Sequence, residues 1–198
     1  LKRNMFARFY FVSDPVLLEI LSQGSNPQEI QQHLPAVLDS VAELGFDKKD
    51  KSKVIWMKSP EGETVPISEN LNVKAAGAVE DWLGNVVTGM QITIKDVIRN
   101  AAGDFATLSS QGIQDTYPAA IALITIQFLW TFDSEDAIKR SKTEKGVLGA
   151  AAKKQAALLD EMIVQTTNPD LAKGPRKCLE TMITIQVHQV EVSQEIVK

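Results

Sequence analysis

Cysteine and histidine are both scarce in this chain of 198 residues. Cys178 is the single cysteine, and His33 and His188 are the two histidines. One cysteine excludes an internal disulfide framework and fits a reducing compartment such as the cytoplasm. With so few histidines, a metal site would have to consist mainly of carboxylates. We therefore predict no metal ligands.

A strong charge of one sign and a long hydrophobic run are also missing. The net charge is −4, with 23% charged and 44% hydrophobic residues, which predicts neither a nucleic acid nor a membrane surface as partner. The most apolar stretch, Pro118–Phe132, is about 5 residues shorter than a membrane-spanning helix and contains Gln127. This stretch therefore predicts a buried core helix.

The motifs of nucleotide-binding and hydrolytic enzymes are absent from the sequence. No glycine precedes a lysine, which excludes a P-loop, and the glycines form no GxGxxG fingerprint. The patterns HExxH, GxSxG and CxxC do not occur. On a helix, Cys178 and His188 would be about 15 Å apart, too far for a nucleophile–base hydrogen bond. We predict a buried thiol, and no catalytic or cofactor-binding residue.

Carboxylate pairs are plentiful, and Glu80-Asp81 and the acidic residues of 133–136 are two such clusters. Paired carboxylates act as acid and base only when burial separates their pKa values. Small or polar neighbours flank both clusters, so solvated helix ends are the favoured interpretation. In the second cluster, the carboxylates are expected to face the positive N-terminal end of a helix that starts at Ser134.

The three tryptophans, Trp56, Trp82 and Trp130, each lie among apolar neighbours. We predict that they anchor the core, and the alternative is a docking surface for another domain.

Two short helices are predicted near the N-terminus. The first covers residues 14–24, where Asp-Pro supplies an N-cap and a proline at the first helical position, and glycine ends the helix. The second begins with a capping box at 26–29, is kinked or divided at Pro35, and ends at Gly45.

A small β-sheet is predicted in the same region. Residues 53–67 form a hairpin around the turn Ser59–Gly62, which places proline at the second position and glycine where a positive φ is needed. Pro66 cannot donate to a ladder, so its strand should lie at an edge. Together with the β-prone run Phe9–Val12, the sheet would have two or three strands.

From about Val73 onward the pattern is helical. Apolar residues follow three-and-four spacing as far as Ile98, and Gly103 and Ser109–Gly112 interrupt it. The next helix begins at Tyr117-Pro118 and either continues past Asp133-Ser134 or restarts there.

Another helix is predicted over residues 150–163, with a stop at Lys173–Pro175. The last segment fits both a strand, with alternating Ile183, Ile185 and Val187, and a helical face. These patterns predict a mainly α fold with a small β element. We divide it into residues 1–72, helix pair plus sheet, and 73–198, a long-helix bundle.

Five blocks of the sequence resemble dynein heavy chains, in the same order. Phe6–Phe11 is similar to the family's Phe-Pro-Arg-Phe-Tyr-Phe, with Ala7 in place of proline. The other blocks resemble the family's Ser-x-Glu-Gly-Glu, Val-Glu-x-Trp-Leu and Gln-x-x-Trp-Thr motifs and the stretch that precedes its first AAA+ module. They are 59–63, 79–83, 127–137 and 183–189. The wording of 117–137 and of the C-terminal block resembles outer-arm axonemal chains of the gamma type.

The resemblance implies a fold and a role. The chain would be the C-terminal part of the linker, a rod of packed helical bundles that lies across the AAA+ ring and joins its first module. It would transmit the ATP-driven change of the ring into a power stroke for ciliary or flagellar movement, without hydrolysing ATP itself. The last segment is then a helix leading into the ring.

Further implications concern partners and location. ATP and Mg²⁺ would bind in the parent ring beyond Lys198, and microtubules would bind a distant stalk. Partners would be the AAA+ ring of the same chain and other heavy, intermediate and light chains of the dynein arm. Such a protein belongs in the cytoplasm and the axoneme of cilia or flagella. No initiator methionine is present, and the ends lie in mid-pattern, as expected of a piece of a longer chain.

Other readings stay open for particular segments and for the whole chain. The charged run Asp47–Lys53 is interpreted as a solvated loop, and the alternative is a basic finger for the microtubule surface. Gly103, Ser109–Gly112 and Lys173–Pro175 are candidate hinges by composition, or plain interhelix loops. As a whole, the chain could instead be a helical scaffold or adaptor that binds other proteins, or an enzyme with an unrecognised site.

Overall fold

The computed structural model describes residues 1–104, 108 and 110–198. The chain divides into two units, Leu1–Asp96 (unit 1) and Val97–Lys198 (unit 2). Most described residues are helical, and a small antiparallel sheet lies in unit 1, which confirms the predicted fold class. The predicted division at residues 72 and 73 stays a prediction. None of the described helices is both long and apolar enough to cross a membrane.

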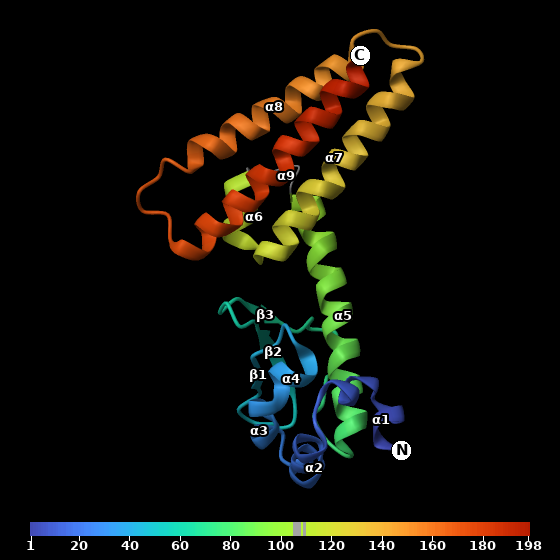
Figure 1. The fold of residues 1–198 in the computed structure, drawn as a ribbon, viewed down its shortest axis with the longest axis vertical. Helices are drawn as coiled ribbons and strands as arrows, with labels where there is room; N and C mark the ends of the chain where they lie inside the picture. Colours follow the sequence, from blue (N-terminus) through green and yellow to red (C-terminus); the bar gives the residue numbers. More distant parts are fainter. Residues whose placement is uncertain (105–107, 109) are drawn as a thin grey trace. The chain divides into compact units, whose positions relative to one another are not determined.

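Unit 1 consists of short helices, one sheet and the first part of a long helix (Figure 1). In chain order its elements are α1 (Lys2–Met5), η1 (Ala7–Phe11), α2 (Asp14–Gln23), α3 (Pro27–Ile30), η2 (Gln31–His33), α4 (Leu34–Leu38), β1 (Glu43–Phe46), β2 (Val54–Lys58), β3 (Thr64–Pro66) and α5 (Val79–Asp104). The last residues of α5 belong to unit 2.

The prediction of a strand at Phe9–Val12 is wrong, because η1 is a 3-10 helix. A strand would direct Phe9 and Phe11 to the same face. Instead Phe9 is fully buried and packs edge-on against Phe6, with ring centroids 5.0 Å apart, whereas Phe11 is exposed. Burial of one aromatic ring therefore outweighs the local β-propensity of this run.

The predicted starts of the first two helices are partly correct. Ser13, and not Asp14, lies at the N-cap of α2, and Asp14 instead accepts a 2.6 Å hydrogen bond from Arg3. Asn26 does cap α3 by accepting from the Gln28 N–H at 3.3 Å. In a capping box, the Glu29 side chain would accept a hydrogen bond from the Asn26 N–H. Here the Asn26 N–H donates to the Gln23 carbonyl instead.

The sheet has the order β1-β2-β3, so the predicted hairpin and the edge position of Pro66 are both confirmed. Pro35 also divides the helical segment as predicted, and η2 ends just before α4. Gly45 does not end a helix but lies in β1, opposite Trp56. A Cβ atom at Gly45 would lie 1.8 Å from Trp56 Cε2, so the indole ring requires glycine there.

A glutamine side chain covers the outer edge of β1. The Gln31 amide nitrogen donates to the Leu44 carbonyl at 2.6 Å, and the Leu44 N–H donates to Gln31 Oε1 at 3.0 Å. The amide thus supplies the donor and the acceptor that a neighbouring strand would supply. This is one way to protect a sheet edge from unwanted pairing.

Helix α5 starts six residues later than the pattern predicts. Val73 precedes the helix, and its carbonyl accepts from the Val54 N–H at 2.9 Å, next to an isolated β-bridge between Lys53 and Lys74. Trp82 on the buried face of α5 donates its indole N–H to the Gly24 carbonyl at 3.1 Å. Gly103 lies inside the last turn of α5, contrary to the predicted break.

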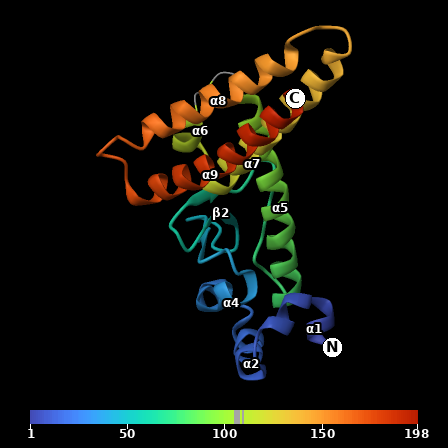
Figure 2. The ribbon, with the colours of Figure 1, turned by 45° about the horizontal axis from the view of Figure 1, so that its top comes forward.

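In the part of unit 2 that the structure describes, four further helices follow: α6 (Ser110–Thr116), α7 (Ala119–Ser141), α8 (Val147–Gln165) and α9 (Lys173–Val197). Figures 1 and 2 show α7, α8 and α9 side by side, and α6 lies near one end of this bundle. Helix α7 passes Asp133-Ser134 unbroken, and the ambiguous C-terminal segment is helical throughout.

Two predictions of loops in unit 2 are wrong. Lys173–Pro175 forms the first turn of α9, in agreement with the tolerance of proline in a first turn. Gly112 lies within α6, whereas Ser109 is outside the described residues.

Candidate functional site

The residues considered for catalysis are not brought together by the fold. The half-buried Cys178 thiol contacts the Met182 sulfur at 3.7 Å on its own helix, and His188 is exposed two to three turns further along α9. The described residues contain no group of histidine, cysteine or acidic side chains that could hold a metal ion. No reaction is therefore assigned to them.

The first acidic cluster is not a solvated helix end as predicted. Glu80 is buried and forms an ion pair with Lys2, while Asp81 is exposed. The hydrogen bond from Lys2 and a backbone hydrogen bond lower the pKa of Glu80, against the effect of burial. A carboxylate held ionised in this way fixes the N-terminal segment to the start of α5, and it is a poor proton donor.

The second acidic cluster lies in the middle of α7, so it does not face a helix N-terminus as predicted. Asp133 accepts from Lys154 of α8 at 2.6 Å. Glu135 and Asp136 pair with lysine or arginine one turn later, at 3.4 and 3.3 Å. These are exposed pairs on a solvated helix face, of the kind that contributes little to stability.

The charged run Asp47–Lys53 is a loop, as predicted, and its own carboxylates order it. Asp47 accepts from the N–H groups of Lys49 and Asp50, which lowers its pKa. Asp50 accepts from Ser52 and pairs with Lys74 at 2.9 Å, and its pKa falls to about 2. The loop contains two aspartates and four lysines, so it presents a mixed charge.

Two of the tryptophans differ in their surroundings. Trp82 is 1% exposed and anchors the core of unit 1, as predicted. Trp130 in α7 is half-buried and donates its indole N–H to the Ser193 hydroxyl of α9 at 3.0 Å. It therefore joins two helices of unit 2 through a polar contact.

The feature of unit 2 that sequence reasoning missed is a buried row of polar side chains. We call Gln155, Gln186, Gln189 and Ser193 the polar seam; each is at most 7% exposed. The amide nitrogen of Gln186 donates to the Gln155 carbonyl at 3.0 Å and to its side-chain oxygen at 2.9 Å. Ser193 donates to the Gln189 carbonyl at 2.7 Å.

The spacing of α9 contained a signal for this seam. Leu179, Met182, Gln186, Gln189 and Ser193 are separated by three or four residues in turn, which is a heptad pattern. A search for apolar residues alone instead selects Leu179, Ile183, Val187 and Val190 as the buried face, whereas Val187 is 39% exposed. Three-and-four spacing continued by polar residues thus marks the helix face that is buried.

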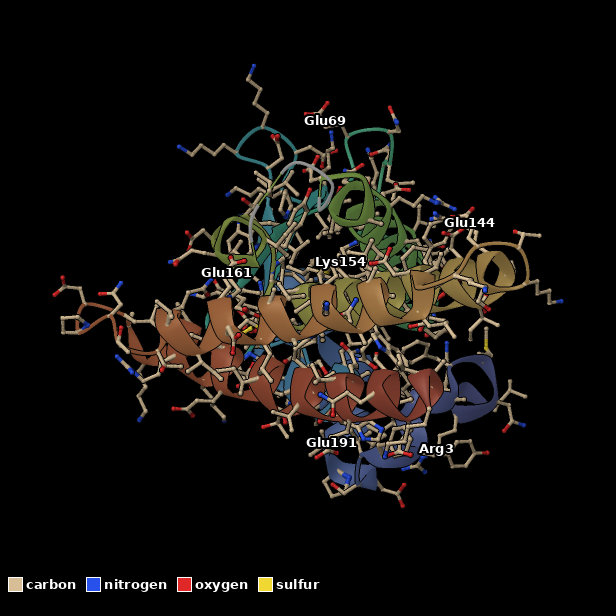
Figure 3. All side chains as sticks on the ribbon, turned by 90° about the horizontal axis from the view of Figure 1, so that it is seen from above. Arg3, Glu69, Glu144, Lys154, Glu161 and Glu191 are labelled. Atoms are coloured by element: carbon tan, nitrogen blue, oxygen red, sulfur yellow. The ribbon has the colours of Figure 1, made fainter. Side chains whose placement is uncertain are left out.

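A groove with a volume of about 510 Å³ lies beside the seam, between α7 and α8. Its lining is largely apolar, with Trp130, Phe132 and Leu158, and the Asp133–Lys154 pair stands among the polar lining residues. Phe128 and Phe132 of α7 are more than half exposed. Figure 3 shows Lys154 and Glu161 on α8 and Glu191 on α9 directed away from the contact between these helices.

Comparison with known proteins places this geometry in context. The family model described as "Dynein heavy chain, N-terminal region 2" matches residues 1–101. The chain is 40% identical to human dynein axonemal heavy chain 8 over 202 residues, which covers 100% of the chain. It is 35% identical to the gamma chain of the flagellar outer arm of Chlamydomonas reinhardtii and to the ciliary beta chain of Tripneustes gratilla. The chain spans 4% of the length of each of these relatives.

Proposed function

Because this chain belongs to the dynein heavy chain family, we propose that it is a force-transmitting segment of the heavy-chain linker, of the outer-arm gamma type. In this role it passes the ATP-driven change of the AAA+ ring to the rest of the motor. The parent protein is then a microtubule motor ATPase of the ciliary or flagellar axoneme. Its ring binds ATP and Mg²⁺, and its stalk binds microtubules.

The observation that carries this proposal is the packing of three long helices into one bundle. Helices α7, α8 and α9 have 23, 19 and 25 residues. At about 1.5 Å per residue, each is roughly 28–38 Å long. Helices of this length, packed along their sides, resist bending because a close-packed interior has low compressibility. Stiffness of this kind is what a mechanical element needs.

The test uses a dynein motor that contains this segment. A short flexible Gly-Ser insertion after Asp96, inside α5, interrupts this helix where it passes from unit 1 into unit 2. We expect microtubule gliding velocity to fall while ATP hydrolysis continues. The matched control carries the same insertion after Glu61, in the exposed hairpin turn, and should keep both activities.

Two results would contradict the proposal. Unchanged gliding with the insertion after Asp96 would show that force does not pass through this helix. Saturable ATP hydrolysis by the isolated chain, abolished by a point substitution within it, would make the segment an enzyme, and its carboxylates would then be reconsidered as an active site.

A further inference from the structure

The two ends of the bundle formed by α7, α8 and α9 have different interiors. We call the end near the α8–α9 connection the apolar end. It contains six buried apolar residues, one of them from α6, and each is at most 2% exposed. They are Ile113, Ala122, Ile126, Met162, Leu179 and Met182. The other end, the polar end, contains the polar seam.

The polar seam leaves hydrogen-bonding capacity unused. The side-chain oxygens of Gln186 and Gln189 are buried, and neither has a hydrogen-bond partner among the described residues. A buried acceptor without a donor loses its hydration and receives nothing in return. Near Ser193, the lining of a small space includes three alanines, Ala137, Ala151 and Ala152, together with Leu148 and Ile196.

Packing and polarity therefore change together along α9. Before Gln186, the buried face of α9 consists of Leu179 and Met182, which contact apolar side chains of α6, α7 and α8. From Gln186 onward, the buried positions hold mainly amides and a hydroxyl, and α6 no longer contributes to the apolar cluster. Apolar burial is the main force that holds helices together. The attachment of α9 to its neighbours is therefore weaker beyond Gln186.

We infer that the C-terminal part of α9, from Gln186 to Val197, is a separable segment that detaches locally from α7 and α8 while the apolar end stays packed. Once detached, this stretch loses the tertiary packing that stabilises a helix in water, so its backbone hydrogen bonds open as well. The Gln155–Gln186 pair sets the register to which the segment returns, since a polar pair in a helix seam is satisfied in one register only. This property belongs to the bundle itself and holds whether or not the proposed motor function is correct.

Hydrogen–deuterium exchange of the 198-residue chain tests the inference directly. We expect amides 187–190 to exchange at least about tenfold faster than amides 178–185, since an unsatisfied buried acceptor has an energetic cost of this order. Amides 187–190 lie before the last turn of α9, so ordinary fraying of the helix end does not explain faster exchange there. Equal protection of the two stretches would overturn the inference.

A double variant, Gln155→Leu with Gln186→Leu, sharpens the test. It replaces the polar pair by apolar side chains and should slow exchange of amides 187–190 roughly tenfold while leaving 178–185 unchanged. Gln194→Leu, at an exposed position of the same helix, is the matched control and should change neither stretch. Faster exchange of 187–190 in a folded double variant would show that the glutamines hold the segment closed. If the double variant loses its helical circular dichroism, the wild-type profile decides alone.

Discussion

Unit 1 and unit 2 are held together by different kinds of contact. In unit 1, short elements are joined by single contacts between residues distant in sequence, such as Trp82 with Gly24 and Gln31 with Leu44. In unit 2, three long helices pack side by side over several turns, and most charged pairs lie on the surface. In unit 1 two elements often depend on one contact, whereas in unit 2 several turns of the same helices contribute to the packing.

This difference predicts how each unit responds to substitution. A single change at a long-range contact should destabilise unit 1 strongly, because one side chain often fixes two elements at once. Single changes on the exposed face of unit 2 should have small effects, because the remaining turns still hold the helices. Four substitutions test this comparison, beginning with the largest expected effect.

Trp82→Ala is expected to have the largest effect. It removes a side chain that is 1% exposed and the hydrogen bond to the Gly24 carbonyl, which should cost about 3–5 kcal/mol of the free energy of unfolding. Urea unfolding followed by circular dichroism measures the loss. Trp130→Ala is the matched change in unit 2, where the indole is half-buried, and it should cost clearly less. Equal losses would remove the distinction between the units.

Glu80→Gln should have the next largest effect, because it breaks the buried ion pair with Lys2. We expect a loss of about 2–3 kcal/mol, below the range for fully buried pairs, since Lys2 is half-exposed. Asp81→Asn, at the exposed neighbouring position, should leave the free energy of unfolding nearly unchanged.

The same pair predicts a dependence on pH. The pKa of Glu80 is lowered in the folded state from its usual value of 4.5. Its contribution is therefore fully present above pH 4.5 and is lost as the pH falls through the lower, folded-state pKa. Wild type should lose more stability than Glu80→Gln between pH 5 and the acid limit. Parallel curves would contradict this assignment.

Gln31→Ala should have a moderate effect. It leaves the N–H and the carbonyl of the buried Leu44 without their partners, at a cost of about 1–2 kcal/mol. Gln32→Ala, at the exposed next position, is the control and should be silent. Because the edge of β1 is then open, the variant should also self-associate more readily, which light scattering measures. A silent Gln31→Ala would mean that water replaces the amide.

Arg140→Ala should have the smallest effect. Arg140 forms exposed pairs with Asp136 on α7 and with Glu144 just beyond the end of this helix. The hydrogen bond from Arg140 lowers the pKa of Glu144. Exposed pairs of this kind are screened by salt. Thermal unfolding at low and high salt should therefore differ little between variant and wild type. A loss as large as that of Gln31→Ala would show that the surface of unit 2 is not redundant.

Several parts of the fold were predictable from the sequence because their signals are local. The hairpin turn is set by Pro60 and Gly62, the cap of α3 by Asn26, and the helices α7 and α8 by long runs of helix-forming residues. Each of these signals acts within a few residues of its own position. The resemblance to dynein heavy chains also rests on local wording, and the comparisons confirm it.

The errors occurred where burial or a distant residue decides the outcome. Phe9 became helical because its ring is buried in the core, and Gly45 became part of a strand because the Trp56 ring lies over it. Glu80 looks like a solvated helix end until Lys2, 78 residues away, forms its partner. None of these partners can be identified from the spacing of residues nearby.

The sequence by itself determined the helical class, the turns and caps, and the family of this protein, because these depend on neighbouring residues and on short sequence motifs. The spacing of α9 indicates which of its faces could be buried, but only the tertiary structure decided that the polar residues on that face are removed from water. Gln186 and Gln189 have the composition of a surface, and only the approach of α7 and α8 removes them from water. Desolvation depends on what surrounds a side chain, and that requires the whole chain to be folded.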